Sequence, residues 1–81
     1  MNEQHDLMEL VQSIFREVSD KPLGEITPQT PIAEMGIDSV SLAEIVGRIE
    51  DSLNIEVPAS QWLRVRTVQE VIDMITQASQ K

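Results

Sequence analysis

Three stretches of the chain repeat apolar residues at spacings of three and four, and this periodicity constrains the fold more than any other feature. Such spacing lines up apolar side chains on one face of an α-helix. The first stretch should end near Ser19 and Asp20, ahead of Pro22, and the second at Asn54 and Pro58. The repeated positions are Leu7, Leu10, Val11, Ile14, Phe15 and Val18, then Leu42, Ile45, Val46, Ile49 and Leu53, and finally Val68, Val71, Ile72 and Ile75.

Capping residues precede the second and third stretches. Asp38 or Ser39 can accept a hydrogen bond from the free amides of a first helical turn. Thr67 and Glu70 have the spacing of a capping box, in which each side chain bonds the other residue's backbone amide. Between these helices, residues 59–65 predict a brief helix that brings Trp62, Leu63 and Val65 near the core, while residues 54–58 are a loop.

The connection over residues 19–38 is long for a compact domain. Loops of this length are uncommon and are usually functional. It is rich in proline and glycine, yet its apolar residues should hold it against the core. Thr30 can cap a short helical turn with Pro31 at its first position. The apolar residues of the loop are Leu23, Ile26, Ile32 and Met35.

These elements predict an all-α fold, a four-helix bundle with a short third helix and a long loop between helices 1 and 2, as a single domain over residues 1–81. Six basic against fourteen acidic residues give a net charge of −8, which disfavours nucleic acid and anionic membranes as partners. We expect a monomer that attracts basic patches on other proteins. Because cysteine is absent and the charged start is unlike a signal peptide, we expect a cytoplasmic location.

The sequence offers little for catalysis. His5 is the only imidazole and lies in a terminal stretch, so it supports neither a metal site nor a serine-based triad. The carboxylates lack the spacing of a calcium loop, and no glycine-rich phosphate loop is present. We therefore predict no catalytic residues, no metal site and no enzyme activity.

One segment stands apart, Gly36-Ile37-Asp38-Ser39-Val40. Alone, it is a turn followed by a helix cap, a common pattern. In an acidic four-helix chain, after a long loop, it resembles the acyl carrier proteins, which place a serine in such a motif at the start of their second helix. The similarity extends to the short third helix after Val57-Pro58 and the Thr-Val-Gln start of the fourth.

The resemblance implies a 4′-phosphopantetheine arm, transferred from coenzyme A to Ser39 by a phosphopantetheinyl transferase whose magnesium ion Asp38 helps to hold. A helix N-terminus suits the phosphodiester of such an arm. Acyl-loading and acyl-processing enzymes with basic patches would then dock on the second helix. The docking residues are Val40, Glu44, Gly47, Glu50 and Asp51, and an acyl chain would be sheltered by Val46, Ile49, Trp62, Leu63 and Ile72.

Several residues depart from the pattern of a primary fatty-acid carrier. Val40 replaces the more typical leucine, Gly47 replaces a larger apolar residue, and Arg48 interrupts the acidic run. Trp62, Arg64 and Arg66 also make the third helix bulkier and less acidic. We therefore favour a discrete carrier of polyketide or other specialised acyl biosynthesis. A fatty-acid carrier, an aminoacyl carrier and a small acidic interaction module without an arm remain alternatives.

Overall fold

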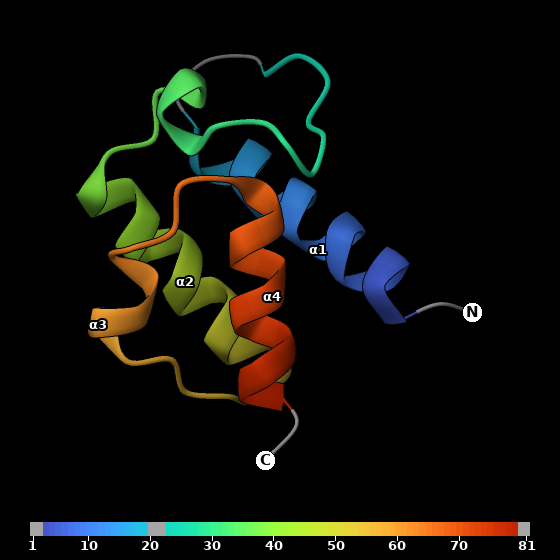
Figure 1. Ribbon diagram of the computed structural model, residues 1–81, viewed down its shortest axis with the longest axis vertical. Helices are drawn as coiled ribbons and strands as arrows, with labels where there is room; N and C mark the ends of the chain where they lie inside the picture. Colours follow the sequence, from blue (N-terminus) through green and yellow to red (C-terminus); the bar gives the residue numbers. More distant parts are fainter. Residues whose placement is uncertain (1–2, 20–22, 80–81) are drawn as a thin grey trace.

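The computed structural model describes residues 3–19 and 23–79, with side chains from residue 6 onward. The expected stop signals Asp20 and Pro22 and the side chain of His5 lie outside that described part. The helices form where the apolar periodicity places them, which confirms the all-α bundle (Figure 1). They are α1 (Glu3–Val18), α2 (Ser39–Leu53), the one-turn α3 (Ala59–Trp62) and α4 (Val68–Ser79), with a 3₁₀ turn, η1 (Ile32–Met35), in the long loop.

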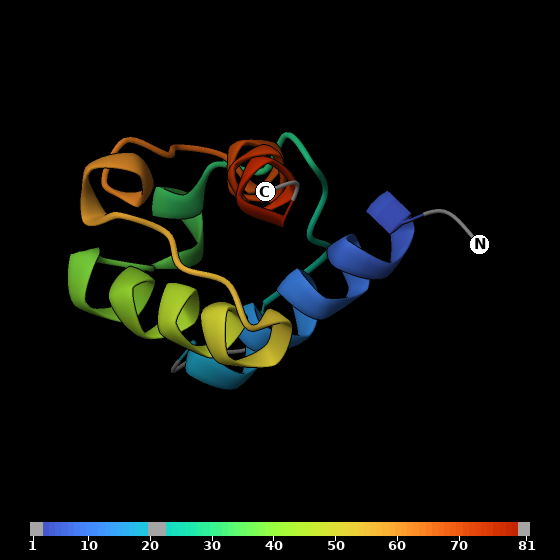
Figure 2. The same ribbon diagram turned by 90° about the horizontal axis from the view of Figure 1, so that it is seen from below.

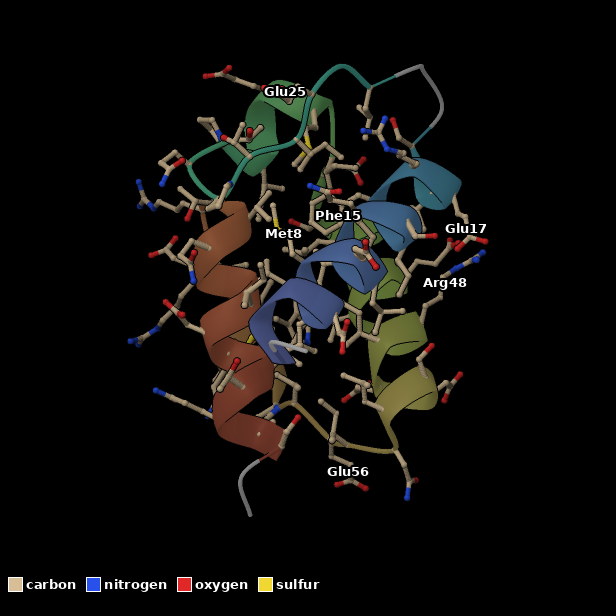
Figure 3. The ribbon with its side chains drawn as sticks, turned by 90° about the vertical axis from the view of Figure 1, so that its right-hand side faces the viewer. Met8, Phe15, Glu17, Glu25, Arg48 and Glu56 are labelled. Atoms are coloured by element: carbon tan, nitrogen blue, oxygen red, sulfur yellow. The ribbon has the colours of Figure 1, made fainter. Side chains whose placement is uncertain are left out.

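The helices enclose a single core of aliphatic residues and one phenylalanine. α1 packs against both α2 and α4, and α3 packs against α4. Figure 2 shows α4 end-on, with α1 and α3 on opposite sides of it. Figure 3 looks onto α1, whose Phe15 is fully buried. Burial of these side chains is the main stabilising contribution, at roughly 25 cal/mol per Å² of apolar surface. The fully buried side chains are Val11, Phe15, Ile45, Ile49, Val68, Val71 and Ile75.

Side chains of α1 hold the long loop in place. The amide of Gln12 donates to the carbonyl of Ile26 at 2.8 Å, and the Arg16 guanidinium donates to the carbonyls of Leu23 and Gly24. Ile26 itself is buried in the core, as are Ile32 and Met35 further along, whereas Leu23 is half-buried. The prediction that apolar residues hold this connection against the core is therefore confirmed.

The end of the loop pairs with the segment ahead of α4. The amide of Ile32 donates to the carbonyl of Arg66 at 2.8 Å, and the amide of Val68 donates to the carbonyl of Thr30 at 3.2 Å. These bonds surround an isolated antiparallel bridge between Pro31 and Thr67. Two segments more than 30 residues apart in the sequence are thus joined beside the start of α2.

Three local predictions were wrong. Pro31, not Thr30, occupies the cap position of η1, and the Thr30 hydroxyl instead accepts a hydrogen bond from the amide of Thr27. The third helix ends at Trp62 rather than Val65, because the amides of Arg64 and Val65 bond carbonyls three residues back, whereas the Leu63 amide still bonds the carbonyl of Ala59. Trp62 and Val65 both pack on the core, but Leu63 is 59% exposed. One residue step along a helix rotates a side chain by about 100°, so Leu63 turns away from the side that Trp62 buries.

Candidate functional site

Ser39 is the first residue of α2, and its side chain is exposed. Gly36 has φ 71°, a left-handed conformation that favours glycine and turns the chain out of η1. Ile37 is then buried, and Asp38 and Ser39 emerge at the surface. The local sequence thus presents a hydroxyl where the loop meets a helix N-terminus.

Asp38, and not Ser39, caps α2. Its Oδ1 accepts a hydrogen bond from the Ser41 amide at 2.8 Å, and its carbonyl accepts one from the Leu42 amide. Both residues were candidates for this role in the sequence. Asp38 performs it. The Ser39 hydroxyl has no hydrogen bond to the described part of the chain, so its Oγ is available for chemistry.

The electrostatics of this helix start favour a bound anion at Ser39 and an ionised Asp38. The hydrogen bond from the Ser41 amide, followed by one with the Ser41 hydroxyl, lowers the pKa of Asp38 below its ordinary value. The first amides of α2 lack intrahelical partners, and the positive end of the helix dipole lies beside them. A phosphodiester attached at Ser39 Oγ would therefore fit the donors present, as anions commonly do at helix N-termini.

A groove of about 540 Å³ runs beside Ser39. It lies where the loop end, the start of α2 and the segment after α3 meet, so the pairing of residues 31 and 67 helps to form it. Its lining is mainly apolar, with Asp38, Ser39 and Arg66 as polar members. The apolar members are Pro31, Ile32, Ala33, Ile37, Leu42, Leu63 and Val65.

A second groove of about 540 Å³ lies between α3 and α4. Ser60, Gln61, Arg64, Glu70 and Asp73 make its walls largely polar, and Ser39 is not among its lining residues. The groove beside Ser39 is therefore the one that suits an apolar chain tethered there.

The five residues predicted to shelter an acyl chain do not line one cavity. Val46, Ile49 and Ile72 are at most 3% exposed and belong to the tightly packed core, and Trp62 is half-buried against it. Only Leu63 lines the groove beside Ser39. The other apolar lining residues were not predicted as a set, since they come together only through the contact between the long loop and residues 63–67.

The outward side of α2 carries the predicted docking residues in a line. Val40, Glu44, Gly47 and Asp51 are separated by four, three and four residues, so they share one face of the helix. We call these four residues the α2 ridge. Val40 is 79% exposed, and both acids are exposed.

Glu50 lies beside this ridge and has a structural role. Its Oε2 accepts a hydrogen bond from the amide of Val57 at 2.6 Å, and Val57 is buried. The carboxylate thereby joins α2 to the loop that leads into α3. Its predicted role in docking stays a prediction.

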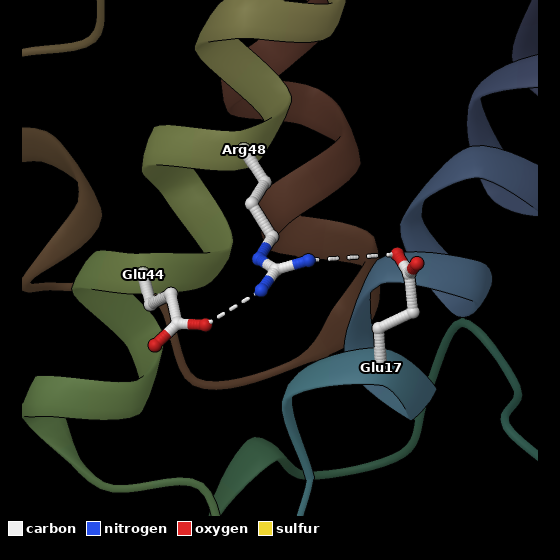
Figure 4. A network of polar contacts seen from close by, with 3 residues as sticks. All are labelled: Glu17, Glu44 and Arg48. Carbon is white, nitrogen blue, oxygen red and sulfur yellow. Dashed lines mark hydrogen bonds and ion pairs between the residues drawn. The ribbon is translucent and has the colours of Figure 1, made fainter.

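Arg48 lies on the other flank of the ridge and holds two acids (Figure 4). Its Nη2 donates to Glu44 Oε2 at 2.9 Å, one turn back on α2, and its Nη1 lies 3.9 Å from Glu17 Oε1 on α1. The sequence showed Arg48 only as a break in the acidic run. The pair with Glu17 depends on how α1 crosses α2, which no local pattern reveals.

The described residues offer no support for a membrane-spanning helix or a metal centre. Residues 3–19 and 23–79 include no helix long and apolar enough to cross a membrane. Within the same ranges, no group of three or more histidine, cysteine or acidic side chains is placed to hold a metal ion. The cytoplasmic location expected from the sequence stays a prediction.

The helical bundle thus presents an exposed serine hydroxyl at the start of its second helix, where a group could be attached. The family model described as the phosphopantetheine attachment site matches residues 9–75, which include the whole of α2. The chain is also 33% identical over 78 residues to an acyl carrier protein of Guillardia theta, covering 95% of each sequence. The chain belongs to the acyl carrier protein family, which confirms the resemblance seen in its sequence.

The chain is also similar to part of a much larger synthase and to a solved structure of an acyl carrier protein. The chain is 34% identical over 67 residues to part of the triacetic acid lactone synthase cle1 of Aspergillus versicolor, covering 83% of this chain and 4% of that protein. Its fold matches the crystal structure of an acyl carrier protein from Thermotoga maritima with a TM-score of 0.85, at 22% identity, over 96% of this chain and 92% of the other.

Family membership settles the class of function. The prosthetic group is a covalently attached 4′-phosphopantetheine, and the domain is a carrier of acyl groups rather than a catalyst. It works with enzymes of acyl biosynthesis. The thiol that the cysteine-free sequence lacks is supplied by that arm.

Proposed function

We propose that this chain is a discrete, single-domain acyl carrier protein whose arm is attached to Ser39. The assignment to Ser39 rests on the different roles of two adjacent residues at the start of α2. Asp38 caps the helix, and the exposed Ser39 hydroxyl has no partner among the described residues. An ionised Asp38 next to it suits the magnesium ion of a phosphopantetheinyl transferase, which needs oxygen ligands.

The proposed modification is a phosphoryl-type transfer from coenzyme A. Ser39 Oγ forms the new bond to phosphorus and loses its proton, and the adenosine 3′,5′-bisphosphate half of coenzyme A leaves. When bound, the arm supplies a thiol that holds acyl groups as thioesters. The apolar groove beside Ser39, which includes Ile32, Leu42 and Leu63, would cover the part of the arm or cargo nearest its attachment.

Intact mass tests this assignment. The wild-type chain, incubated with coenzyme A and a broad-specificity phosphopantetheinyl transferase, should gain one phosphopantetheine. Ser39→Ala should stay at the apo mass. Because Ser39 does not cap α2, this variant should lose no more than about 0.5 kcal/mol of folding free energy. Modification of Ser39→Ala, or of Ser41 in its place, would refute the assignment to Ser39.

We further propose that its pathway is polyketide or another specialised acyl biosynthesis. The chain is also similar to parts of a non-reducing polyketide synthase and a bikaverin polyketide synthase, which supports this choice, as do the bulky Trp62 and the basic residues Arg48, Arg64 and Arg66. Fatty-acid and aminoacyl carriers remain the alternatives. Mass spectrometry of the carrier isolated from its own cells would identify the acyl group on the arm and decide among these three.

Partner enzymes are proposed to dock on the α2 ridge through basic patches. The ridge presents Glu44 and Asp51 on a chain of net charge −8, so association should be fast at low salt and slow as ionic strength rises. Glu44→Lys should reduce acyl transfer to a partner enzyme without unfolding the domain. Asp6→Lys, an equal charge change at an exposed position of α1, is the matched control. Equal losses in the two variants would contradict docking at α2.

A further inference from the structure

Arg66 is the single basic residue among those that line the groove beside Ser39. Asp38 and Ser39 are the other polar residues of that lining, and the rest are apolar. Although the chain has fourteen acidic and six basic residues, the Arg66 guanidinium forms no ion pair with a described residue. It is therefore available to an anion that enters the groove.

The backbone of Arg66 is fixed on both sides by hydrogen bonds. Its amide donates to Glu70 Oε1 at 2.6 Å, and its carbonyl accepts from the amide of Ile32 at 2.8 Å. The same Glu70 oxygen also accepts from the Thr67 amide, so this neighbouring carboxylate is engaged by backbone groups rather than by the guanidinium. The exposed side chain of Arg66 thus starts from a fixed point at the edge of the groove.

A phosphodiester at Ser39 would add a negative charge next to that of Asp38. The Asp38 carboxyl is ionised at neutral pH, since aspartate ordinarily titrates at about pH 3.9. The two charges would repel each other, and the net charge of −8 adds to this repulsion. The free amides at the start of α2 offset part of it. Arg66 supplies the full positive charge in the lining of this groove, so it can neutralise the added phosphodiester.

A guanidinium matches a phosphodiester in shape as well as in charge. Its planar N–H groups can donate two parallel hydrogen bonds to phosphate oxygens, and it stays charged throughout the physiological pH range. We propose that Arg66 binds the phosphodiester of the arm at Ser39 and thereby directs the arm into the apolar groove. This inference rests on the proposed attachment to Ser39, and it adds a positioning residue that lies outside α2.

The place of Arg66 in the fold sets the direction of the arm. Arg66 lies in the segment between α3 and α4, and Leu63 and Val65 of that segment line the groove with it. An arm held through Arg66 would begin its path over these apolar side chains. It would cover part of Leu63, which is 59% exposed, and burial of that apolar surface favours the same placement.

The test removes the charge of Arg66 and compares the apo and holo forms. The variants are Arg66→Gln, the charge-retaining Arg66→Lys and, as matched control, Arg64→Gln. Arg64 is also exposed and lies two residues away, but it lines the groove between α3 and α4 instead. Each chain is converted to the holo form with coenzyme A and a broad-specificity phosphopantetheinyl transferase, and intact mass verifies complete modification. The thermal midpoint and the backbone amide NMR spectrum of both forms are then measured at low salt.

The thermal midpoints report on the pairing. In the apo forms, Arg66→Gln and Arg64→Gln should melt within about 2 °C of each other, because each has lost one exposed cation. The holo-minus-apo difference of Arg66→Gln should lie about 2–4 °C below that of wild type, as expected for one exposed ion pair in a domain of this size. Arg66→Lys should recover at least half of this loss, and Arg64→Gln should match wild type.

The amide spectra report on the path of the arm. On modification of the wild-type chain, the amides of Leu63 and Val65 should shift, and in Arg66→Gln these shifts should fall by at least half. Arg64→Gln should retain them. The amides of Ser39 and Val40 should shift in every variant, because they adjoin the covalent attachment.

Each outcome supports or overturns a stated part of the inference. A holo-minus-apo thermal difference that is equal in wild type and Arg66→Gln would overturn the pairing, and complete modification of the same samples at Ser39 would leave the carrier function intact. Equal thermal losses in Arg66→Gln and Arg64→Gln would also overturn it, since net charge rather than position would then matter. A thermal loss with unchanged shifts at Leu63 and Val65 would overturn the path over the groove. A wild-type chain that accepts no phosphopantetheine would overturn the carrier function and this inference with it.

Discussion

The hydrogen bond between Glu50 and the Val57 amide can be tested by mutation, because it gives Glu50 a structural role that its acidic neighbours on α2 do not share. Glu50→Ala removes the acceptor of the Val57 amide, a bond of 2.6 Å. A buried or half-buried amide left without a partner costs about 1–3 kcal/mol. Alanine returns at most about 0.7 kcal/mol through its higher helix propensity. The expected net loss is about 1–2 kcal/mol of folding free energy.

Urea unfolding followed by helical circular dichroism measures this loss. The midpoint should fall at an unchanged slope, and the thermal midpoint should drop by about 5–15 °C for a domain of this size. Glu44→Ala is the matched control on the same helix. Its exposed pair with Arg48 should contribute no more than about 0.5 kcal/mol.

Hydrogen exchange at the Val57 amide tests this hydrogen bond directly. The amide of Val57 should exchange faster in Glu50→Ala than in wild type, while amides in the middle of α4 change only with global stability. Glu50→Gln, which keeps an oxygen acceptor, should recover part of the loss. Equal destabilisation by Glu50→Ala and Glu44→Ala, with Val57 exchange unaltered, would show that this bond does not hold the loop.

Three further predictions follow from charge and burial. The hydrogen bond from the Ser41 amide lowers the pKa of Asp38 in the folded chain. The ionised Asp38 carboxylate therefore stabilises the fold above its unfolded pKa near 3.8, and this stabilisation is lost as the pH falls through the lower folded pKa. Asp38→Asn keeps a cap acceptor but cannot titrate, so the thermal midpoint of this variant should fall less steeply below about pH 4 than that of the wild type. Equally steep declines in the two proteins would refute this. The net charge of −8 implies self-repulsion, so the thermal midpoint should rise from low to moderate salt, and a flat response would show that local pairs already offset it. If cargo contacts the half-buried Trp62, a medium-length acyl chain on the arm should shift its emission and reduce iodide quenching, whereas identical spectra in the apo, holo and acyl forms would remove Trp62 from the cargo site.

The sequence alone determined the features that depend on residues within one or two turns of each other. Apolar spacing predicted the three long helices, and the capping box is present, with Glu70 accepting from the Thr67 amide and Thr67 accepting from the Glu70 amide. α2 ends at Asn54 as predicted, and the structure adds that Asn54 has a left-handed conformation. The place of Ser39 at a helix start was readable for the same reason, because turn, cap and helix are set by adjacent residues.

Only the tertiary structure decided which side chains meet across elements. The bridge between Pro31 and Thr67 helps to form the groove beside Ser39, and the crossing of α1 over α2 brings Glu17 to Arg48. A one-turn helix has too few residues for a periodic pattern to show which way Leu63 points. Such contacts depend on the rotation and spacing of packed helices, and those are set by the fit of many core side chains at once.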